Sequence, residues 1–331
     1  MSHRRHRPAR NWGARLHEIT WFGLRAVVLE NELLRVTVLA DKGGDVAEFC
    51  YKRRDMDFVW LAPDGIRNPR DVAGGASDDV AAFLDHYEGG WQEVLPNGGL
   101  PSTYRGAALA QHGEVAGLPW DVEIVTDDPG EIAVRLSVRA RRMPLRVTKT
   151  FRLVCGRPEL LIDEELTNES GVELEVMWGH HIVFGAPFLL PGHRIRLPPE
   201  VESDPVVTEK ELTVVPDYGR PSDIHYLTGF GPDGWYEITD PVDGLGLRVG
   251  WDATVLRHLW VWRELGASRD HPWWGRAYVV GLEPFAGHPT EGLTEAVRNG
   301  SALTLQPHEI KPLWLRASVI DEERPLNGAR N

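Results

Sequence analysis

The stretch Val176-Met-Trp-Gly-His-His-Ile-Val-Phe-Gly-Ala-Pro-Phe188 places two adjacent histidines in an apolar run that closes at Gly185 and Pro187. Such a run predicts a β-strand, in which successive side chains point to opposite faces. His180 and His181 therefore cannot face the same side of a sheet, and one of them should point into whatever hollow the sheet forms. Imidazole titrates near neutral pH, so that histidine is a candidate for proton transfer, with a purely structural role as the alternative.

Strand-like segments extend from this stretch in both directions. The runs 24–30, 34–40 and 45–51 are rich in β-branched residues and are separated by polar or glycine-rich turns, which predicts a β-meander. Further strands are expected at residues 122–125, 131–140, 145–154, 160–168, 173–183, 245–251, 255–264, 273–282, 301–306 and 311–320.

Helical signals are rare. One short helix is expected within residues 78–87, with Ser77 or Asp78 as its N-cap, and residues 190–235 have an irregular, Pro/Gly-rich pattern. No linker divides the chain, so we expect an all-β fold, a large antiparallel β-sandwich that forms a single domain over residues 19–331. Residues 1–18 should form a flexible basic N-terminal tail.

Composition limits the possible partners. A formal net charge of -13 argues against nucleic acid or an anionic membrane, because both require a basic surface. No apolar run reaches the roughly 18–20 residues of a membrane helix, and no secretory signal follows the N-terminus. Cys50 and Cys155 fit small buried thiols in a reducing compartment, which predicts a cytoplasmic protein, either a monomer or a homodimer.

Three other polar groups stand out against apolar or glycine-rich surroundings. Glu283 follows a strand-like apolar run, so its carboxylate should be paired, solvated in a cleft or raised in pKa. It is a candidate base, and a turn cap or an arginine partner is the alternative. His112 precedes Gly113, and Asn97 lies between a proline and a glycine; both also fit ordinary turns. Dinucleotide, phosphate-loop, serine-hydrolase and zinc-protease motifs do not occur, and we expect neither a cofactor nor a metal.

These residues, in this order, resemble the galactose mutarotase-like (aldose 1-epimerase) superfamily, as a divergent branch. The chain has a turn at Leu39-Ala-Asp-Lys-Gly-Gly44, then an Asn-Gly loop, a His-Gly motif, a central strand histidine and a late Leu-Glu-Pro. The similarity extends over most of the chain, from about Trp21 to Ile320. It implies a large β-sandwich (the galactose mutarotase-like supersandwich) with a carbohydrate cleft on the concave face.

The resemblance also implies roles for individual residues. Glu283 matches the general base, and His181 matches the general acid because Phe184 stands where the family has an aromatic residue. His112 matches a sugar-binding histidine, and Asn97 matches the loop asparagine.

The sequence departs from the family pattern after that asparagine. The family usually has an arginine there, whereas this chain has Gly98, and the family's sugar-binding aspartate has no clear counterpart. Arg105 is a candidate to compensate. We expect His180, Trp91 and Trp262 to be further substrate-binding residues, since tryptophan is a frequent platform for sugar rings.

The function implied is aldose 1-epimerase-like: interconversion of the anomers of a sugar or sugar derivative by acid–base ring opening, with a small carbohydrate as substrate. A non-catalytic carbohydrate-binding or sensing protein is one alternative. A glycoside-processing enzyme is another, and it would need a second carboxylate near Glu283, for which Glu264, Glu237 and Glu93 are candidates.

Overall fold

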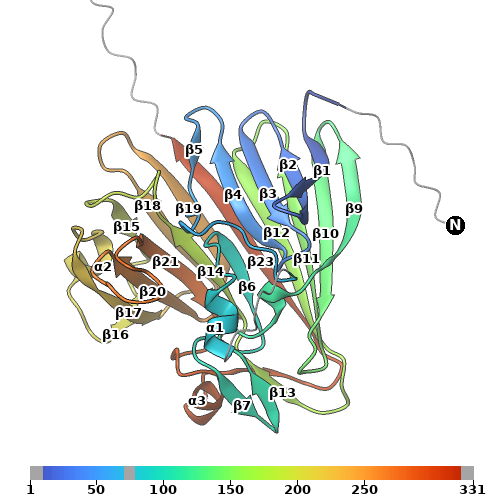
Figure 1. The fold of residues 1–331 in the computed structure, drawn as a ribbon, viewed down its shortest axis with the longest axis vertical. Coiled ribbons are helices and arrows are strands. Elements are labelled where there is room, and N and C mark those ends of the chain that lie inside the picture. Colours follow the sequence, from blue (N-terminus) through green and yellow to red (C-terminus); the bar gives the residue numbers. More distant parts are fainter. Residues whose placement is uncertain (1–9, 71–78, 322–331) are drawn as a thin grey trace, which may run out of the picture.

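The computed structural model describes residues 10–70 and 79–321, which form a sandwich of two large antiparallel sheets (Figure 1). The first sheet has the order β1-β2-β3-β4-β6-β14-β21-β20-β17-β16, with β5 beside β4. Its strands are β1 (Arg15–Trp21), β2 (Leu24–Glu30), β3 (Leu34–Leu39), β4 (Asp45–Tyr51), β5 (Met56–Asp57), β6 (Trp91–Val94), β14 (Gly179–Phe184), β16 (Glu202–Asp204), β17 (Arg220–Thr228), β20 (His258–Leu265) and β21 (Tyr278–Phe285).

The second sheet has the order β15-β18-β19-β23-β12-β11-β10-β9. Its strands are β9 (Asp121–Asp128), β10 (Glu131–Arg139), β11 (Leu145–Val154), β12 (Glu159–Asn168), β15 (Arg194–Arg196), β18 (Asp233–Thr239), β19 (Leu245–Asp252) and β23 (Ile310–Asp321). Two small two-stranded sheets pair β7 (Ser102–Tyr104) with β8 (Ala107–Leu109) and β13 (Leu174–Val176) with β22 (Leu303–Leu305). The short helices are α1 (Asp79–Leu84), η1 (Val115–Gly117), α2 (Glu209–Thr213) and α3 (Leu293–Arg298).

The register around β14 decides which side chains enter the core. His180 pairs with Glu93 of β6, and His181 pairs with Gln92. Because neighbours along a strand alternate between faces, His180 and Glu93 share one face of the sheet and His181 shares the other with Gln92. The face of His180 is the core, since this ring lies 3.4 Å from a carboxylate oxygen of Glu164 on the opposite sheet.

The core between the sheets is large and aromatic. Trp91, Trp120, Trp178 and Trp251 are among the largest fully buried side chains. Every residue of β14 is buried, which explains why this strand is apolar apart from its two histidines. At roughly 25 cal/mol per Å² of apolar surface, such side chains dominate the stabilisation of the sandwich.

The expected β-meander of the first strands is confirmed, whereas two segments differ from expectation. The strand expected over 173–183 is divided between β13 and β14, because Met177 turns to donate its amide hydrogen to the carbonyl of Pro96. The region 190–235 is not irregular throughout: it includes the nine-residue strand β17. The alternation there is weak, since β17 begins with Arg-Pro-Ser-Asp and only its second half is apolar.

The ends of the expected elements also shift. β1 begins at Arg15, so the domain boundary expected at residue 19 falls inside a strand. The helix expected over 78–87 is α1, which ends at Leu84, and both N-cap candidates, Ser77 and Asp78, lie outside the described residues.

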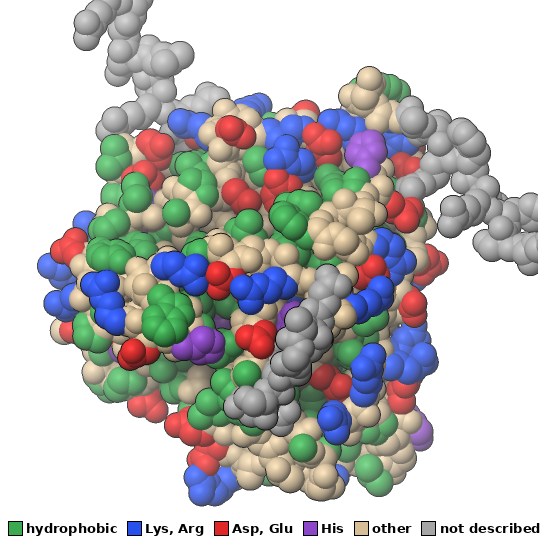
Figure 2. All heavy atoms as spheres, in the orientation of Figure 1, with side chains coloured by type: hydrophobic (Ala, Val, Ile, Leu, Met, Phe, Trp, Pro, Cys, Tyr) green, Lys and Arg blue, Asp and Glu red, His purple; other side chains and the backbone are tan. Residues whose placement is uncertain are grey.

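Two surface properties complete the description. Cys50 is buried as expected, whereas Cys155 is exposed, with its thiol beside the carboxylate of Glu32. None of the helices in residues 10–70 and 79–321 has the length and apolar character that crossing a membrane requires. Figure 2 shows basic and acidic side chains interspersed with apolar ones over the face seen in Figure 1.

Candidate active site

The floor of the candidate site is a row of side chains that crosses neighbouring strands of the first sheet. Gly179 pairs with Phe285 and Val183 with Gly281, which places His181 of β14 opposite Glu283 of β21. On the next strand, Trp260 pairs with Glu283. His181, Glu283 and Trp260 therefore share the face turned away from the second sheet.

A cavity of about 370 Å³ lies over this row. Aromatic side chains form much of its wall: Phe83, Tyr87, Trp260, Trp262 and Trp273. Leu84, Leu100, Ile224 and Pro272 add aliphatic surface, and Gln111, His112, His181, Glu283 and Thr290 add polar groups. Figure 1 shows α1, which carries Phe83, in front of β6 and β14. A mostly apolar cavity with a few convergent polar groups is typical of a small-molecule site.

The two central groups are close but not bonded to each other. Nε2 of His181 lies 3.7 Å from Oε1 of Glu283, which is longer than a hydrogen bond. Within the described residues, neither Oε1 of Glu283 nor Nδ1 of His181 has a hydrogen-bond partner, although both atoms are buried. A buried polar atom without a partner is costly, so each of these two atoms calls for an explanation, and a functional role is one.

Burial sets the charges of these groups. It raises the pKa of Glu283 well above its usual value of 4.5. It also lowers the pKa of His181 well below 6.5, and the neighbouring His112 adds to this effect. Burial alone lowers the pKa of His112 to about 4. Near neutral pH both imidazoles are therefore uncharged.

His112 is held over the floor by its loop. Its ring centroid is 5.2 Å from that of His181 and 4.7 Å from that of Phe83. Nδ1 of His112 accepts a hydrogen bond from the amide of Gly99 at 3.3 Å, which leaves Nε2 as its second polar atom. The next residue must be glycine, because Gly113 has φ of +73° and a Cβ there would lie 2.1 Å from the carbonyl oxygen of Leu95.

Asn97 lies beneath the cavity wall and outside its lining. Its amide nitrogen donates to the carbonyl oxygens of Leu100 and Ala110, both at 2.9 Å. Its side-chain oxygen accepts the amide hydrogen of Leu293 at the start of α3. The side chain thus joins three segments, one of which leads directly into His112.

The structure explains the glycine that follows Asn97. A Cβ on Gly98 would lie only 3.0 Å from Phe285 and 3.2 Å from Trp260, whose rings are stacked 3.9 Å apart. Any longer side chain at this position, arginine included, would require these rings to shift. Arg105 does not replace it in the cavity: its guanidinium donates to the carbonyl of Glu173 and lies 3.6 Å from Glu175, and the side chain is 51% exposed.

His180 and Trp91 lie on the core face, away from the cavity. Nε1 of Trp91 donates to Nδ1 of His180 at 3.0 Å. His180, Glu93 and Glu164 offer ligand atoms within 4.8 Å of one another, a spacing that could hold a metal ion. At this place Lys149 supplies a positive charge, with its ammonium 2.5 Å from Glu93 and 3.7 Å from Glu164. We therefore assign this buried cluster to the core.

Several lining residues had no signal in the sequence. Tyr87 follows α1, and its ring lies 5.4 Å from that of His181. Its hydroxyl is buried and forms no hydrogen bond within the described residues. Burial raises the pKa of Tyr87, and the nearby Glu283 raises it further. Trp273 lines the same cavity from the loop before β21, and its ring centroid lies 5.6 Å from that of Trp262. These rings join the cavity wall only through the folding of the loops that carry them.

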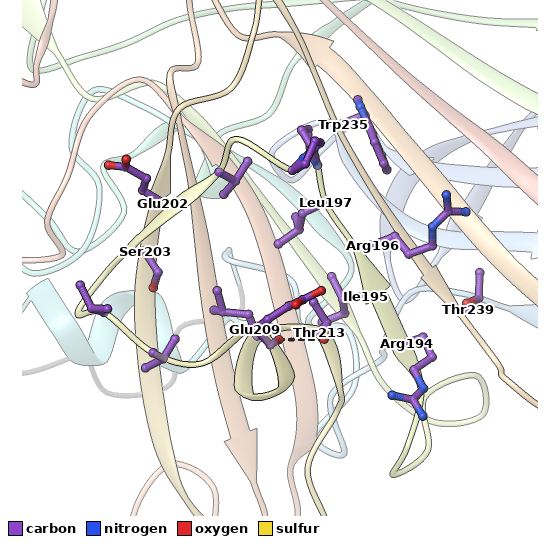
Figure 3. Close-up of a pocket in the computed structure, with 16 residues that line it drawn as sticks. Arg194, Ile195, Arg196, Leu197, Glu202, Ser203, Glu209, Thr213, Trp235 and Thr239 are labelled. Atoms are coloured by element: carbon purple, nitrogen blue, oxygen red, sulfur yellow. Dashed lines mark hydrogen bonds between the residues drawn. The ribbon is translucent and has the colours of Figure 1, made fainter.

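A wider hollow of about 1060 Å³ lies elsewhere, beside β15 and β16 (Figure 3). Arg194 and Arg196 lie on one side of it, and Glu202 lies on the opposite side. These side chains are exposed, and neither a histidine nor a buried carboxylate is among its described lining. The smaller cavity is the better candidate site, because it alone combines burial with an unsatisfied acid–base pair.

Comparisons with known proteins agree with this architecture. The protein called "a putative aldose 1-epimerase" from Klebsiella pneumoniae shares 17% identity over 90% of this chain and 80% of its own, with a TM-score of 0.77. A galactose mutarotase-like protein from Clostridium acetobutylicum shares 12% identity over 93% and 99% of the two chains, with a TM-score of 0.65. A galactose mutarotase related enzyme from Lactobacillus acidophilus shares 14% identity over 89% and 97%, with a TM-score of 0.62.

Likeness at such low identity establishes the fold alone. No curated protein sequence gives a significant match. One family model matches residues 22–319, nearly all of the described domain. The chain therefore belongs to the family described as "Domain of unknown function (DUF4432)", a divergent family with the galactose mutarotase-like fold.

Proposed function

We propose that this protein is an aldose 1-epimerase-like enzyme that interconverts the anomers of a small sugar. One observation carries the proposal: His181 and Glu283 lie 3.7 Å apart, buried and unbonded to each other, on the floor of a 370 Å³ cavity with aromatic walls. Anomer exchange needs one base and one acid at a single ring bond, and this pair supplies both.

In the proposed reaction Glu283 removes the proton from the anomeric hydroxyl while His181 protonates the ring oxygen. The bond between C1 and the ring oxygen breaks, and the sugar becomes an open-chain aldehyde. Rotation about the C1–C2 bond presents the other face of the carbonyl. Closure then returns the proton on the ring oxygen to His181 and places the proton from Glu283 on the new anomeric oxygen, so the pair ends as it began.

The pKa directions at the site fit this chemistry if the pair is treated as one unit. The reactive form carries one proton, with Glu283 ionised and His181 protonated. Burial favours the uncharged distribution of that same proton, on Glu283 rather than His181. The two distributions differ only by a proton shift within the pair, so the reactive form needs no proton from solvent.

The wall residues have a role in the same scheme. Trp262 lies 5.7 Å from His181, centroid to centroid, and presents a face on which a sugar ring can stack. The rings of His112 and Tyr87 also lie close to that of His181, at 5.2 and 5.4 Å, and their polar atoms can hydrogen-bond to sugar hydroxyls. We propose that Asn97 acts indirectly, by fixing the loop that carries His112.

The glycoside-processing alternative requires two carboxylates around one bond. Glu283 is the one carboxylate among the described residues that line the cavity. Glu93 lies on the core face, Glu237 belongs to the second sheet and pairs with Arg196, and Glu264 accepts a hydrogen bond from Ser268. This arrangement favours anomer exchange over glycoside cleavage.

The direct test measures anomer exchange by NMR over a panel of aldoses, with wild-type protein and with the variant Glu283→Gln. We expect exchange above the spontaneous rate for at least one aldose and its loss in the variant. Sugar binding without exchange in the wild type would instead support the non-catalytic binding protein.

A further inference from the structure

The lining of the cavity is short of positive charge. No lysine or arginine belongs to it within residues 10–70 and 79–321. Its two histidines have pKa values lowered by burial, so they are uncharged near neutral pH in the free protein, and His181 becomes a cation only when Glu283 ionises, which leaves the pair without net charge. The one carboxylate among these lining residues is that of Glu283, which is negative when it ionises.

Cations near the lining are already neutralised, as two examples show. Lys42 borders an adjoining cavity of about 240 Å³ and pairs with both Asp45 and Glu88. Arg263 follows Trp262 on β20, and its guanidinium forms two hydrogen bonds with Asp223, at 2.6 and 2.7 Å. Gly98 adds no cation, and a longer side chain there would have to displace the stacked Trp260 and Phe285.

The cavity also has a polar side and an apolar side. His181 and Glu283 occupy β14 and β21, and the sheet continues through β20 to β17. Ile224 on β17 pairs with Trp262 on β20, and both side chains line the cavity. With adjacent strands about 4.8 Å apart, Ile224 is displaced by roughly 10 Å across the sheet from the strand of Glu283. In the pose that extends along the sheet toward β17, a pyranose with its anomeric carbon at the pair brings its distal substituent to Ile224.

Polar atoms on that apolar side are already used. The hydroxyl of Thr290 bonds to that of Tyr226 at 2.8 Å, and Tyr226 also accepts the amide hydrogen of Thr290. Nε1 of Trp260 donates to the carbonyl oxygen of Gly287 at 3.1 Å. A hydroxyl buried there would have to compete with these bonds for a partner, and an anionic group would lack a counter-charge.

We propose that the cavity selects an uncharged aldose with an apolar substituent across the ring from the anomeric carbon, the methyl group of a 6-deoxyaldose being the simplest case. This inference rests on the proposed function, because anomer exchange places the anomeric carbon at His181 and Glu283. It names the substrate class for that site and excludes sugar phosphates and uronates.

The test compares sugars that differ only at C6: the 6-deoxyaldose, the parent aldohexose, the uronate and the 6-phosphate, in the gluco, galacto and manno series. Anomer exchange by NMR gives kcat/KM, and tryptophan fluorescence gives binding. We expect the 6-deoxyaldose to exceed the parent hexose by roughly 5- to 150-fold in kcat/KM in at least one series, the cost of one unpaired buried hydroxyl. The uronate and the phosphate should fall at least tenfold further.

The two readouts separate the two proposals. If the 6-deoxyaldose binds selectively without exchange, the substrate class holds and the enzymatic proposal fails. If a uronate or phosphate binds or exchanges as well as the 6-deoxyaldose, the substrate class is wrong whatever the activity. If no sugar binds or exchanges, both proposals are wrong.

One pair of variants tests the charge argument itself. Leu100 lines the cavity and is 52% exposed, so a long side chain can be accommodated at this position. Leu100→Arg should raise kcat/KM for the uronate relative to the 6-deoxyaldose at least tenfold, whereas Leu100→Gln, which is polar but uncharged, should leave that ratio unchanged. An unchanged ratio in Leu100→Arg would overturn the argument that a missing cation excludes the anion.

Discussion

Replacing Glu283 by glutamine separates catalysis from folding at this site. The change removes an ionisable group but keeps its shape, and the side chain is only 2% exposed, so the packing of the floor should persist. Removal of a positioned acid or base typically costs about 10²–10⁴-fold in rate. This corresponds to about 3–5.5 kcal/mol of transition-state stabilisation. We expect Glu283→Gln to lose anomer exchange by that factor.

The same substitution should lower activity but raise the free energy of unfolding relative to wild type as the pH increases. Burial raises the folded-state pKa of Glu283 above its unfolded value near 4.5. The stability linked to this proton is complete below pH 4.5 and is lost as the pH rises through the folded pKa, because the unfolded chain ionises first. Over that interval the wild type loses up to about 1.4 kcal/mol per pH unit through this group, and the glutamine variant does not. The variant should therefore gain stability relative to wild type as the pH rises above 4.5.

Urea unfolding at several pH values and anomer-exchange NMR measure the two effects on the same samples. Glu264→Gln is the matched control: Glu264 is also buried on the first sheet, but it lies outside the cavity lining and is bonded to Ser268. That control should retain wild-type exchange. The reasoning is refuted if Glu283→Gln exchanges anomers at the wild-type rate, or if its stability relative to wild type falls as the pH is raised.

Four further outcomes are expected. The pH profile of kcat/KM should be bell-shaped, because the pair must carry one proton. Activity should fall on the acid side as His181 gains a proton, with a pKa below 6.5, and on the alkaline side as Glu283 loses its proton, with a pKa above 4.5. A profile with a single limb would contradict the paired assignment. Lys149→Met should cost about 3–5 kcal/mol in urea unfolding, because it leaves two buried glutamates without their cation. Asn97→Ala should cost about 1.5–4.5 kcal/mol through its three hydrogen bonds and should also lower kcat/KM; stability equal to wild type would rule out the loop-fixing role. Arg105→Ala should change stability by no more than about 0.5 kcal/mol and leave exchange unchanged, and a loss of exchange would place this exposed residue back in the site.

The sequence was informative where the pattern is local. The runs that form β2, β3, β4 and β11 alternate or are apolar over their whole length, and their positions were predicted to within a residue. β17 was missed because its first half is polar. Its second half shows that packing decides the outcome: His225 and Leu227 are buried in a strand whose beginning is exposed. Tertiary contact thus overrides propensity in this strand.

The same distinction between local sequence pattern and tertiary contact applies to the candidate site. Motif order along the chain pointed to His181, His112 and Glu283, and all three line one cavity. Tyr87 and Trp273 were expected within a helix (78–87) and a strand (273–282), but α1 ends at Leu84 and β21 begins at Tyr278, so both residues lie in loops, and contacts between distant segments bring them into the cavity lining. Trp91 was expected to bind sugar but faces the core. The sequence alone does not show which face of a sheet a tryptophan will occupy.

The adjacent histidines show how the two faces depend on each other. Period-two alternation requires opposite sides for them, but it does not say which histidine is buried in the core. The choice follows from the partners that meet His180 between the sheets: Trp91 on β6 and Glu164 on β12. A slip of β14 by one residue would exchange the two imidazoles and break those contacts. The buried polar cluster around His180 therefore fixes the register of β14. Through that register, contacts on the core face of the strand determine that His181 faces the cavity.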